Sequence, residues 1–213
     1  MPGTQAENSG KPYMSIFEGR LMMGAHEDTE GAVKRTKSSG KVVWEIPYKS
    51  WEGIVRGWEM KEFEYEGKKI KSLNVEFDDA KLSLSGKMMG EFIKKFAGAD
   101  HEKAIVISPY PDFVGKDGTM KKSGLTVMQD GKRLYSHFTD VKDGVYTMKN
   151  GYPVAPAAWS EMTDAQKKIY NIQTDEFLEA YVKLNPIIAK VEEPTINLDE
   201  PEEEKLRLED VPY

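Results

Sequence analysis

The sequence predicts a mainly β fold organised around residues 53–138, and three observations carry this prediction. Three segments with strand patterns follow one another across short turns, a helical pattern comes next, and two more strand segments close the region. Five strands with one helix after the third strand is the order of the OB-fold, a small Greek-key barrel of five strands. The alternative is another small β-rich barrel or sandwich. We also expect extra strands before this region and helices after it.

The N-terminal part is expected to add strands to the barrel. Residues 1–12 are polar and contain Gly and Pro, so we expect them to be disordered. Ser15–Met23 has the pattern of one strand, and Lys41–Tyr48 that of another. Between them, Gly24–Gly40 is expected to be a mobile loop. Its basic cluster has two interpretations, a solvated loop or a flexible arm that contacts phosphates: Lys34, Arg35 and Lys37.

The first strands of the barrel are defined by alternation and turns. Ile54–Tyr65 and Lys68–Phe77 flank the turn dipeptide Glu66-Gly67, and Ala80–Ser85 alternates apolar and polar residues. Within Ile54–Tyr65 the apolar residues change from even to odd positions. We therefore predict a β-bulge near Gly57 or Glu62, or a strand that crosses from one side of the barrel to the other.

A change of period marks the helix. Apolar residues recur at helical spacing up to Gly98, which offers a stop: Met88, Met89, Phe92, Ile93 and Phe96. Ala104–Ser108 is a short apolar strand. Gly124–Gln129 and Lys132–Phe138 then bracket Asp130-Gly131, a strong hairpin signal.

The C-terminal part predicts one hairpin and two helices. Asn150-Gly151 is expected to turn a hairpin between Val145–Met148 and Tyr152. Thr163 and Gln166 form a capping box for a helix that ends near Ile172, and Thr174 caps a second helix. The expected organisation is therefore a barrel domain with extensions over residues 13–160, helices packed on it over 161–190, and a disordered tail over 191–213.

Composition divides the 213 residues into a neutral body and an acidic tail. Residues 191–213 hold nine acidic side chains against Lys205 and Arg207, a net charge of −7, which leaves 28 basic and 27 acidic side chains in residues 1–190. The chain has no cysteine, which excludes disulfides and thiolate metal sites. No apolar run has the length of a membrane span, and the first residues lack the apolar region of a signal peptide. We expect a soluble cytoplasmic protein without membrane contact.

A search for catalytic motifs favours a protein that is not an enzyme. His26, His101 and His137 lie in different predicted elements, and Asp78-Asp79 fits a turn better than an acid–base pair. Ser85-Gly86-Lys87 lacks the first glycine and the Ser or Thr of a phosphate-binding P-loop. No metal or cofactor is implied.

Aromatic residues interleaved with cations are the strongest functional signal. Bases stack on aromatic rings and phosphates bind Lys and Arg, so this pattern predicts a surface for single strands. The candidate residues are Trp44, Tyr48, Trp51, Arg56, Trp58, Tyr65, Lys68, Lys69, Lys71, Tyr110, Phe113, Lys121, Lys122, Arg133 and Tyr135. The alternative is that several of these aromatics are core residues, and for Trp44, Trp58, Phe63 and Phe138 both interpretations stay open. Tyr110, Phe113 and Tyr135 are expected to be exposed.

Two stretches resemble a known family. The last five residues, Glu209, Asp210, Val211, Pro212 and Tyr213, look like the C-terminal tip of bacterial single-stranded DNA-binding proteins, with Tyr in place of the terminal Phe. The run from Asp117-Gly118 through Lys121, Lys122 and Gly124-Leu125-Thr126-Val127 to Gln129-Asp130-Gly131-Lys132 resembles single-stranded DNA-binding proteins of tailed phages, which have an OB-fold. The resemblance covers roughly residues 41–138 and the tail.

The resemblance implies a protein that coats single-stranded DNA during phage DNA replication or recombination, in the cytoplasm of the host cell. It also implies that the tip, Glu209 to Tyr213, recruits replication or recombination proteins. Two alternatives stay open: a protein-interaction adaptor whose acidic tail mimics nucleic acid, and an RNA-binding chaperone with the same stacking platform. The oligomeric state is not predicted.

Overall fold

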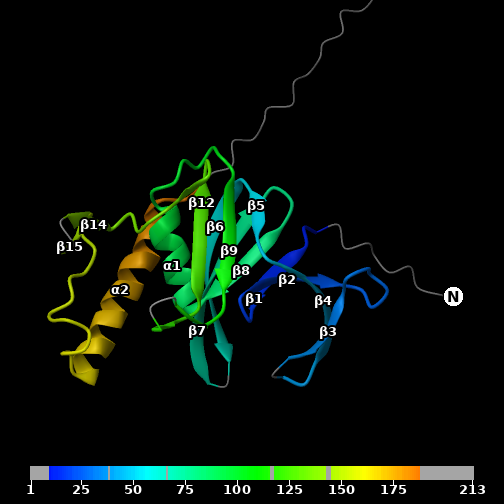
Figure 1. Ribbon diagram of the computed structural model, residues 1–213, viewed down its shortest axis with the longest axis horizontal. Coiled ribbons are helices and arrows are strands. Elements are labelled where there is room, and N and C mark those ends of the chain that lie inside the picture. Colours follow the sequence, from blue (N-terminus) through cyan, green and yellow to red (C-terminus); the bar gives the residue numbers. More distant parts are fainter. Residues whose placement is uncertain (1–9, 38, 66, 116–117, 143–144, 188–213) are drawn as a thin grey trace, which may run out of the picture.

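The computed structural model describes residues 10–187, except residues 38, 66, 116–117 and 143–144. The expected disordered segments therefore lie almost wholly outside the described residues, as does the whole C-terminal tip. The described chain is mainly β, with two helices, as the sequence predicts (Figure 1). Neither helix combines the length and the apolar composition needed to cross a bilayer.

Two sheets and two small hairpins contain the strands. The larger sheet has the order β3-β4-β2-β1-β8-β7-β6 and the smaller one the order β13-β12-β9-β5, while β10–β11 and β14–β15 pair separately. The strands before α1 are β1 (Tyr13–Phe17), β2 (Arg20–Ala25), β3 (Val33–Thr36), β4 (Val42–Tyr48), β5 (Trp51–Gly53), β6 (Val55–Tyr65), β7 (Lys68–Phe77) and β8 (Lys81–Ser85). The strands after α1 are β9 (Ile105–Tyr110), β10 (Phe113–Val114), β11 (Met120–Lys121), β12 (Gly124–Gln129), β13 (Lys132–Arg133), β14 (Thr139–Lys142) and β15 (Val145–Met148).

The two sheets are joined through β5 and β6, which only Ile54 separates. Hydrogen-bonded neighbours therefore follow the path β8-β7-β6, then β5-β9-β12, and α1 (Gly86–Phe96) comes directly after β8. The predicted closed barrel is absent, because no ladder within the described residues joins β8 to β12. The outer edge of β8 instead pairs with β1, in parallel, at Tyr13↔Lys81 and Met14↔Leu82.

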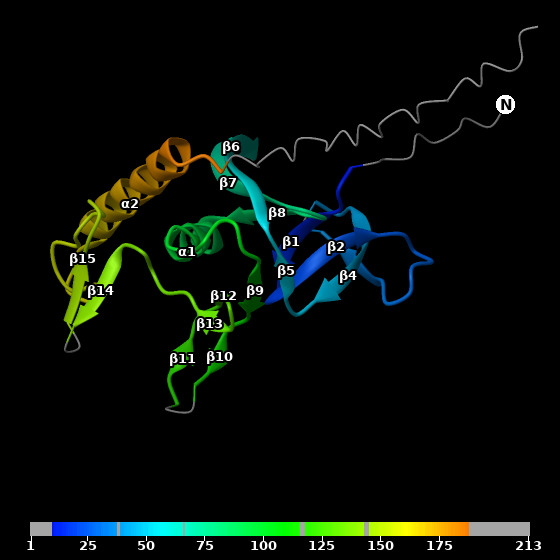
Figure 2. The ribbon, with the colours of Figure 1, turned by 90° about the horizontal axis from the view of Figure 1, so that it is seen from above.

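The core lies between the sheets and the helices. The predicted apolar face of α1 is confirmed, because Met89, Phe92, Ile93 and Phe96 are all buried. A second helix, α2 (Asp164–Leu184), crosses over α1 and β6 and adds Leu178 and Val182 to the core (Figure 2).

Several local predictions are confirmed. The register of β6 against β7 shifts between Val55 and Gly57, so the expected bulge is present. The capping box of Thr163 and Gln166 starts α2. Asp130-Gly131 turns between β12 and β13, and both residues have positive φ.

Other local predictions are wrong. Ser15–Met23 is not one strand but the hairpin β1–β2, which turns at Glu18-Gly19 with positive φ at both residues. The expected loop 24–40 contains β3, which pairs with β4. Thr174 begins no second helix, because its hydroxyl donates to the carbonyl of Asn171 within one continuous α2.

The predicted hairpin around Asn150-Gly151 is also wrong. The hairpin of this region is β14–β15, one step earlier in the chain. Asn150-Gly151 instead makes a turn that carries Tyr152 into the core, where its ring stacks on Phe138 at 5.5 Å between centroids. Burial raises the pKa of Tyr152 to about 12.

Candidate nucleic-acid interface

The outer face of the larger sheet carries exposed aromatic residues. Register places Tyr13 opposite Lys81 and Phe63 opposite Ile70, on the face turned away from the buried Met14 and Leu82. Tyr13, Phe17 and Phe63 are 50%, 39% and 48% exposed. Large apolar rings in water are available for contacts with a ligand. Tyr13 and Phe17 were missed by the sequence prediction, since only the pairing of β1 with β8 brings them to this sheet face, whereas Phe63 was left open between core and surface.

Between these aromatics the outer face is lined with small polar side chains. The pair Asn74↔Ser83 lies beside Tyr13, whose hydroxyl donates a 3.0 Å hydrogen bond to Oδ1 of Asn74. Ser15 and Ser85 belong to the same face by alternation along β1 and β8. This face therefore combines rings with uncharged hydrogen-bonding groups.

A groove borders the outer face along β8 and β1. Its volume is about 750 Å³, and it separates these strands from the base of the β10–β11 hairpin. Ser15, Ser83 and Ser85 contribute to one wall, and Pro111, Asp112 and Ser123 to the other. The groove lies where the two sheets fail to close.

The β10–β11 hairpin gathers four of the predicted site residues. It projects from the body beside the groove (Figure 2). Phe113 is 48% exposed and packs edge-on against Tyr110, with 5.9 Å between ring centroids. Lys121 lies opposite Phe113 in the ladder. Lys122 follows directly and forms a 3.2 Å ion pair with Asp112. Rings and cations thus lie together on the hairpin, next to Pro111, Asp112 and Ser123, which line the groove.

The position of the Tyr110 ring depends on a glycine. Gly124 lies opposite Tyr110 in the β9–β12 ladder, and a side chain at Gly124 would overlap the Tyr110 hydroxyl. The glycine therefore lets the ring lie flat across the start of β12. Tyr110 is half-buried by this packing, so its predicted exposure is only partial.

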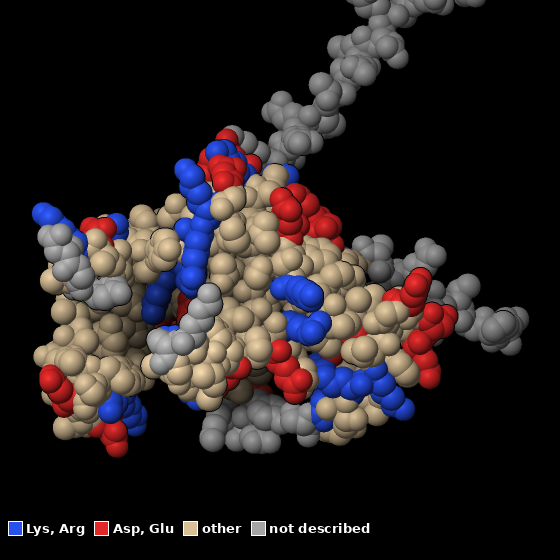
Figure 3. All heavy atoms as spheres, viewed as in Figure 1, with Lys and Arg blue, Asp and Glu red and all other residues tan. Residues whose placement is uncertain are grey.

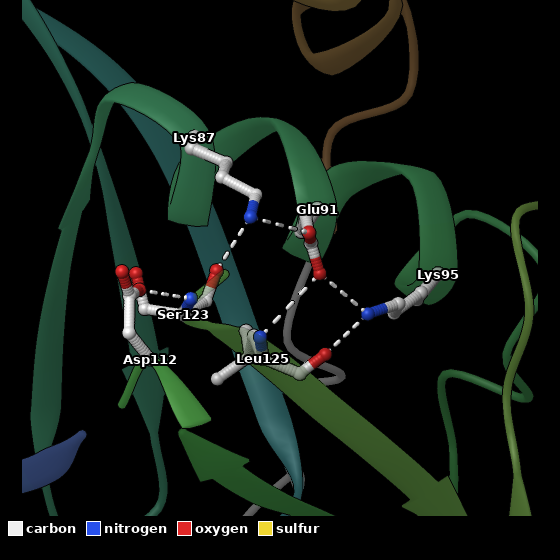
Figure 4. A network of polar contacts seen from close by, with 6 residues as sticks. All are labelled: Lys87, Glu91, Lys95, Asp112, Ser123 and Leu125. Atoms are coloured by element: carbon white, nitrogen blue, oxygen red, sulfur yellow. Dashed lines mark hydrogen bonds and ion pairs between the residues drawn. The ribbon is translucent and has the colours of Figure 1, made fainter. Parts of the chain in front are cut away.

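Side chains of α1 and Asp112 cover the edge of β12 that faces the groove (Figure 4). Lys87 and Lys95 donate to the carbonyl oxygens of Ser123 and Leu125, respectively. The carboxylate of Asp112 accepts from the N–H of Ser123 at 2.5 Å, and that of Glu91 accepts from the N–H of Leu125 at 3.4 Å. These contacts take the place of a neighbouring strand and hold β12 apart from β8.

The two carboxylates of this network remain charged to low pH. Burial raises the pKa of Glu91, but the hydrogen bond from Lys95 at 2.7 Å and the backbone N–H of Leu125 outweigh burial and lower the pKa below its ordinary value. The backbone N–H of Ser123, followed by Lys122, lowers the pKa of Asp112. Because Glu91 and Asp112 both stay ionised, the network is formed at neutral pH.

The tryptophans predicted to bind bases, Trp51 and Trp58, face the inside of the protein and not its surface. Trp58 is only 8% exposed, packs edge-on against Phe96, and donates a 2.8 Å hydrogen bond to the carbonyl of Asn185. It is a core residue and has no free face for a base. Register places Trp51 opposite the buried Ile107, so the Trp51 ring also faces inward.

The neighbouring aromatics Tyr48 and Trp44 follow the same alternation. Tyr48 lies opposite the buried Leu21 and packs edge-on against Trp51 at 5.4 Å. Trp44 alternates with Ile46 and Tyr48 on the same side of β4 and is half-buried. Nζ of Lys34 lies 5.9 Å from the centroid of the Trp44 ring. Of the residues left open by sequence, Phe63 is exposed whereas Phe138 is buried.

The remaining predicted cations are paired or lie away from the groove. Lys71 pairs with Glu179 of α2, Lys69 with Glu62 at 2.8 Å, and Arg56 with Asp78. Arg133 lies 5.8 Å from the ring centroid of Tyr135, which is 74% exposed as predicted.

Some predicted site residues lie outside what the structure describes. These are the side chains of Tyr65 and Lys68, and all of Glu209, Asp210, Val211, Pro212 and Tyr213.

Basic side chains are grouped on the surface although the body is near neutral. In Figure 3, Lys and Arg atoms form a column over α1 and β12 and a second group over β3 and β4. No family model matches the chain, and no similar curated protein or solved structure was found.

Proposed function

We propose that the protein binds single-stranded DNA in the groove between the outer face of the larger sheet and the β10–β11 hairpin. The observation that carries this proposal is that exposed rings lie on β1 and on the β10–β11 hairpin, the elements that border one groove, and that lysines lie on the hairpin. Phe113 and Tyr110 lie on the hairpin side with Lys121 and Lys122. Tyr13 and Phe17 lie on the sheet side. Rings stack on bases with little sequence preference, while lysines bind the phosphates.

The strand order supports an OB-type fold that is open along one seam. The path β8-β7-β6/β5-β9-β12, with α1 after β8, is the order of the five OB strands, without the ladder between the third and the fifth. OB-folds bind oligonucleotides on the face of strands two and three and with the loops between strands one and two and between strands four and five. The equivalent elements here are β7–β8, the β6–β7 hairpin and the β10–β11 hairpin. Of these, β8 and the base of the β10–β11 hairpin line the groove.

The acidic tail completes the proposed function. In this proposal the protein coats single strands during phage replication or recombination, and residues Glu209 to Tyr213 recruit partner enzymes. The body provides the nucleic-acid surface, whereas the nine acidic residues of 191–213 keep the tail away from phosphates when DNA occupies the groove.

Fluorescence anisotropy with labelled oligo-dT tests the groove directly. The change Phe113→Ala removes one exposed ring, and we expect it to weaken binding by roughly 1–3 kcal/mol. Trp159→Ala is the matched control, because Trp159 is also an exposed ring, 54% accessible, but lies between β15 and α2 and not on the hairpin. Equal affinities of Phe113→Ala, Trp159→Ala and the unchanged protein, or no binding of oligo-dT at all, would refute the proposal.

One observation favours a protein partner as a second candidate. Val114 and Met120 are 62% and 59% exposed, so the tip of the hairpin presents apolar side chains that a protein surface would also cover. The two functions differ in their dependence on salt. Affinity for a single strand falls with a log–log slope of about −0.7 per neutralised phosphate, and affinity for an apolar protein contact does not. Adding an RNA oligonucleotide of the same length to the titration tests the chaperone alternative.

A further inference from the structure

A second hollow lies on the N-terminal strands, next to the groove beside the hairpin. Ser15 of β1 lines both, and the second hollow has a volume of about 580 Å³. Residues on the outer face of three adjacent strands line it: Tyr13, Ser15, Met22, Gly24, Val43 and Glu45. His26 and Lys37 lie at its edge. The two hollows are therefore neighbours on either side of Ser15.

The floor of this second hollow is suited to bases. Met22 and Val43 provide apolar surface, and the one carboxylate, that of Glu45, is 4% exposed and fully paired. Arg35 donates to it through Nε at 2.6 Å and through Nη2 at 2.8 Å. This bidentate pair raises the pKa of Arg35 and leaves no uncompensated negative charge that would repel a phosphate.

The basic residues beside the hollow have fixed positions. The sequence left the cluster of Lys34, Arg35 and Lys37 open between a solvated loop and an arm that contacts phosphates. Arg35 is in fact held in β3, and its guanidinium lies 4.3 Å from the ring centroid of Phe17. Figure 3 shows the surrounding Lys and Arg side chains gathered over β3 and β4. Glu45 balances the charge of Arg35, so the cation that lines the hollow and can contact a phosphate is Lys37.

We infer that β1–β4 form a second section of the single-strand path, in which Tyr13 and Val43 contact bases while Lys37 contacts phosphates. The inference rests on the proposed function and adds to it the length of the bound strand. A short oligonucleotide fills only the groove beside the hairpin, whereas a longer one also reaches the N-terminal hollow. The affinity for single strands therefore rises with length beyond what the first groove binds.

Gly24 offers a way to change the second hollow alone. It lines that hollow but not the first groove, and no heavy atom lies within 4 Å of a Cβ built on it. Gly24→Glu therefore adds a carboxylate without a clash, and Gly24→Lys adds the opposite charge at the same point. Ala180→Glu, at an exposed position of α2, is the control for the change in net charge.

The test compares oligo-dT of about six and about 24 nucleotides, lengths chosen to fall near the lower end and beyond the upper end of one OB-fold's site size. We expect Gly24→Glu to weaken binding of the long strand at least about fivefold, which corresponds to one lost base contact. The affinity for the short strand should stay within about twofold of that of the unchanged protein. Gly24→Lys should bind the long strand at least as tightly as the unchanged protein does, and Ala180→Glu should change neither affinity.

Each other outcome contradicts a specific statement. If the unchanged protein binds neither length, the proposed function is wrong. If the protein binds both lengths and Gly24→Glu affects neither, or affects both equally, the second section of the path is wrong while the groove beside the hairpin stands. Circular dichroism of Gly24→Glu verifies that the variant is folded, as the open space around Gly24 predicts.

Discussion

Glu91 joins the core helix to the edge of the groove, and replacing it with glutamine removes its charge but keeps its shape. In the folded protein its carboxylate accepts from Lys95 at 2.7 Å and from the N–H of Leu125 at 3.4 Å. The amide oxygen of the introduced glutamine retains one neutral hydrogen bond, while the buried ammonium group of Lys95 loses its counter-charge. A hydrogen bond to a charged group contributes about 1.5–3 kcal/mol, so we expect the free energy of unfolding of Glu91→Gln at pH 7 to fall by about 1–3 kcal/mol.

The pH dependence of this loss has a definite sign. The pKa of Glu91 in the folded state lies below its ordinary value of 4.5, so the folded protein is stabilised above pH 4.5. That stabilisation disappears as the pH falls through the lowered pKa, because both states then hold the proton. Glu91→Gln carries no such proton, so the difference in stability between the two proteins should shrink between pH 7 and pH 3.

Urea denaturation at pH 7, 5, 4 and 3, followed by circular dichroism, measures this difference. At pH 7 the melting temperature should also fall, by about 2–4 °C per kcal/mol for a protein of this size. Glu62→Gln is the control, since it removes an exposed ion pair with Lys69, and exposed pairs contribute little. This account of the network would be refuted if Glu91→Gln and the unchanged protein had the same free energy of unfolding at pH 7. It would also be refuted if the difference between their free energies of unfolding stayed constant down to pH 3.

Three further predictions concern the tail and the core. Deleting Val191–Tyr213 should tighten oligo-dT binding most at low salt, because a tethered segment of charge −7 competes with DNA for the lysines beside the groove, and salt screens this competition. An affinity that the deletion leaves unchanged throughout a salt titration would contradict this. Deleting only Val211–Tyr213 should leave DNA affinity nearly unchanged and abolish capture of replication enzymes. Pull-downs that recover the same enzymes with the intact and the shortened protein would contradict this prediction. Trp58→Phe removes the hydrogen bond to Asn185 and should destabilise the fold by about 1 kcal/mol, measured by calorimetry, without changing DNA affinity, measured by anisotropy. A loss of DNA affinity would show that Trp58 belongs to the binding site.

The strands and α1 were predictable because their signals are local. Alternation in Lys68–Phe77 and helical spacing in Met88–Phe96 depend only on neighbours in the chain, and a turn such as Asp130-Gly131 requires backbone angles that few residues adopt. The continuation of α2 through Thr174 was not predictable in this way. A threonine that can cap a helix also fits inside one when its hydroxyl bonds to a preceding carbonyl, as it does to Asn171.

The candidate interface was only partly predictable because it depends on contacts between distant segments. Phe113, Lys121 and Lys122 were found because a short hairpin brings nearby residues together. Tyr13 and Phe17 were missed because their exposure follows from the parallel pairing of β1 with β8, a strand far away in the sequence. Trp58 was left open between core and surface because a tryptophan followed by charged residues has the same local pattern whether α2 covers it or not.

The covered edge of β12 also bears on how the protein behaves at high concentration. An unpaired strand edge is a template on which a second chain can add a strand, and this is a common start of aggregation. Here Lys87, Glu91, Lys95 and Asp112 occupy the N–H and C=O groups of Ser123 and Leu125, so a neighbouring molecule finds charged side chains in place of free backbone. If the protein coats single strands as proposed, many copies can lie side by side along one strand without pairing through this edge, and each copy remains free to dissociate when the DNA is paired again.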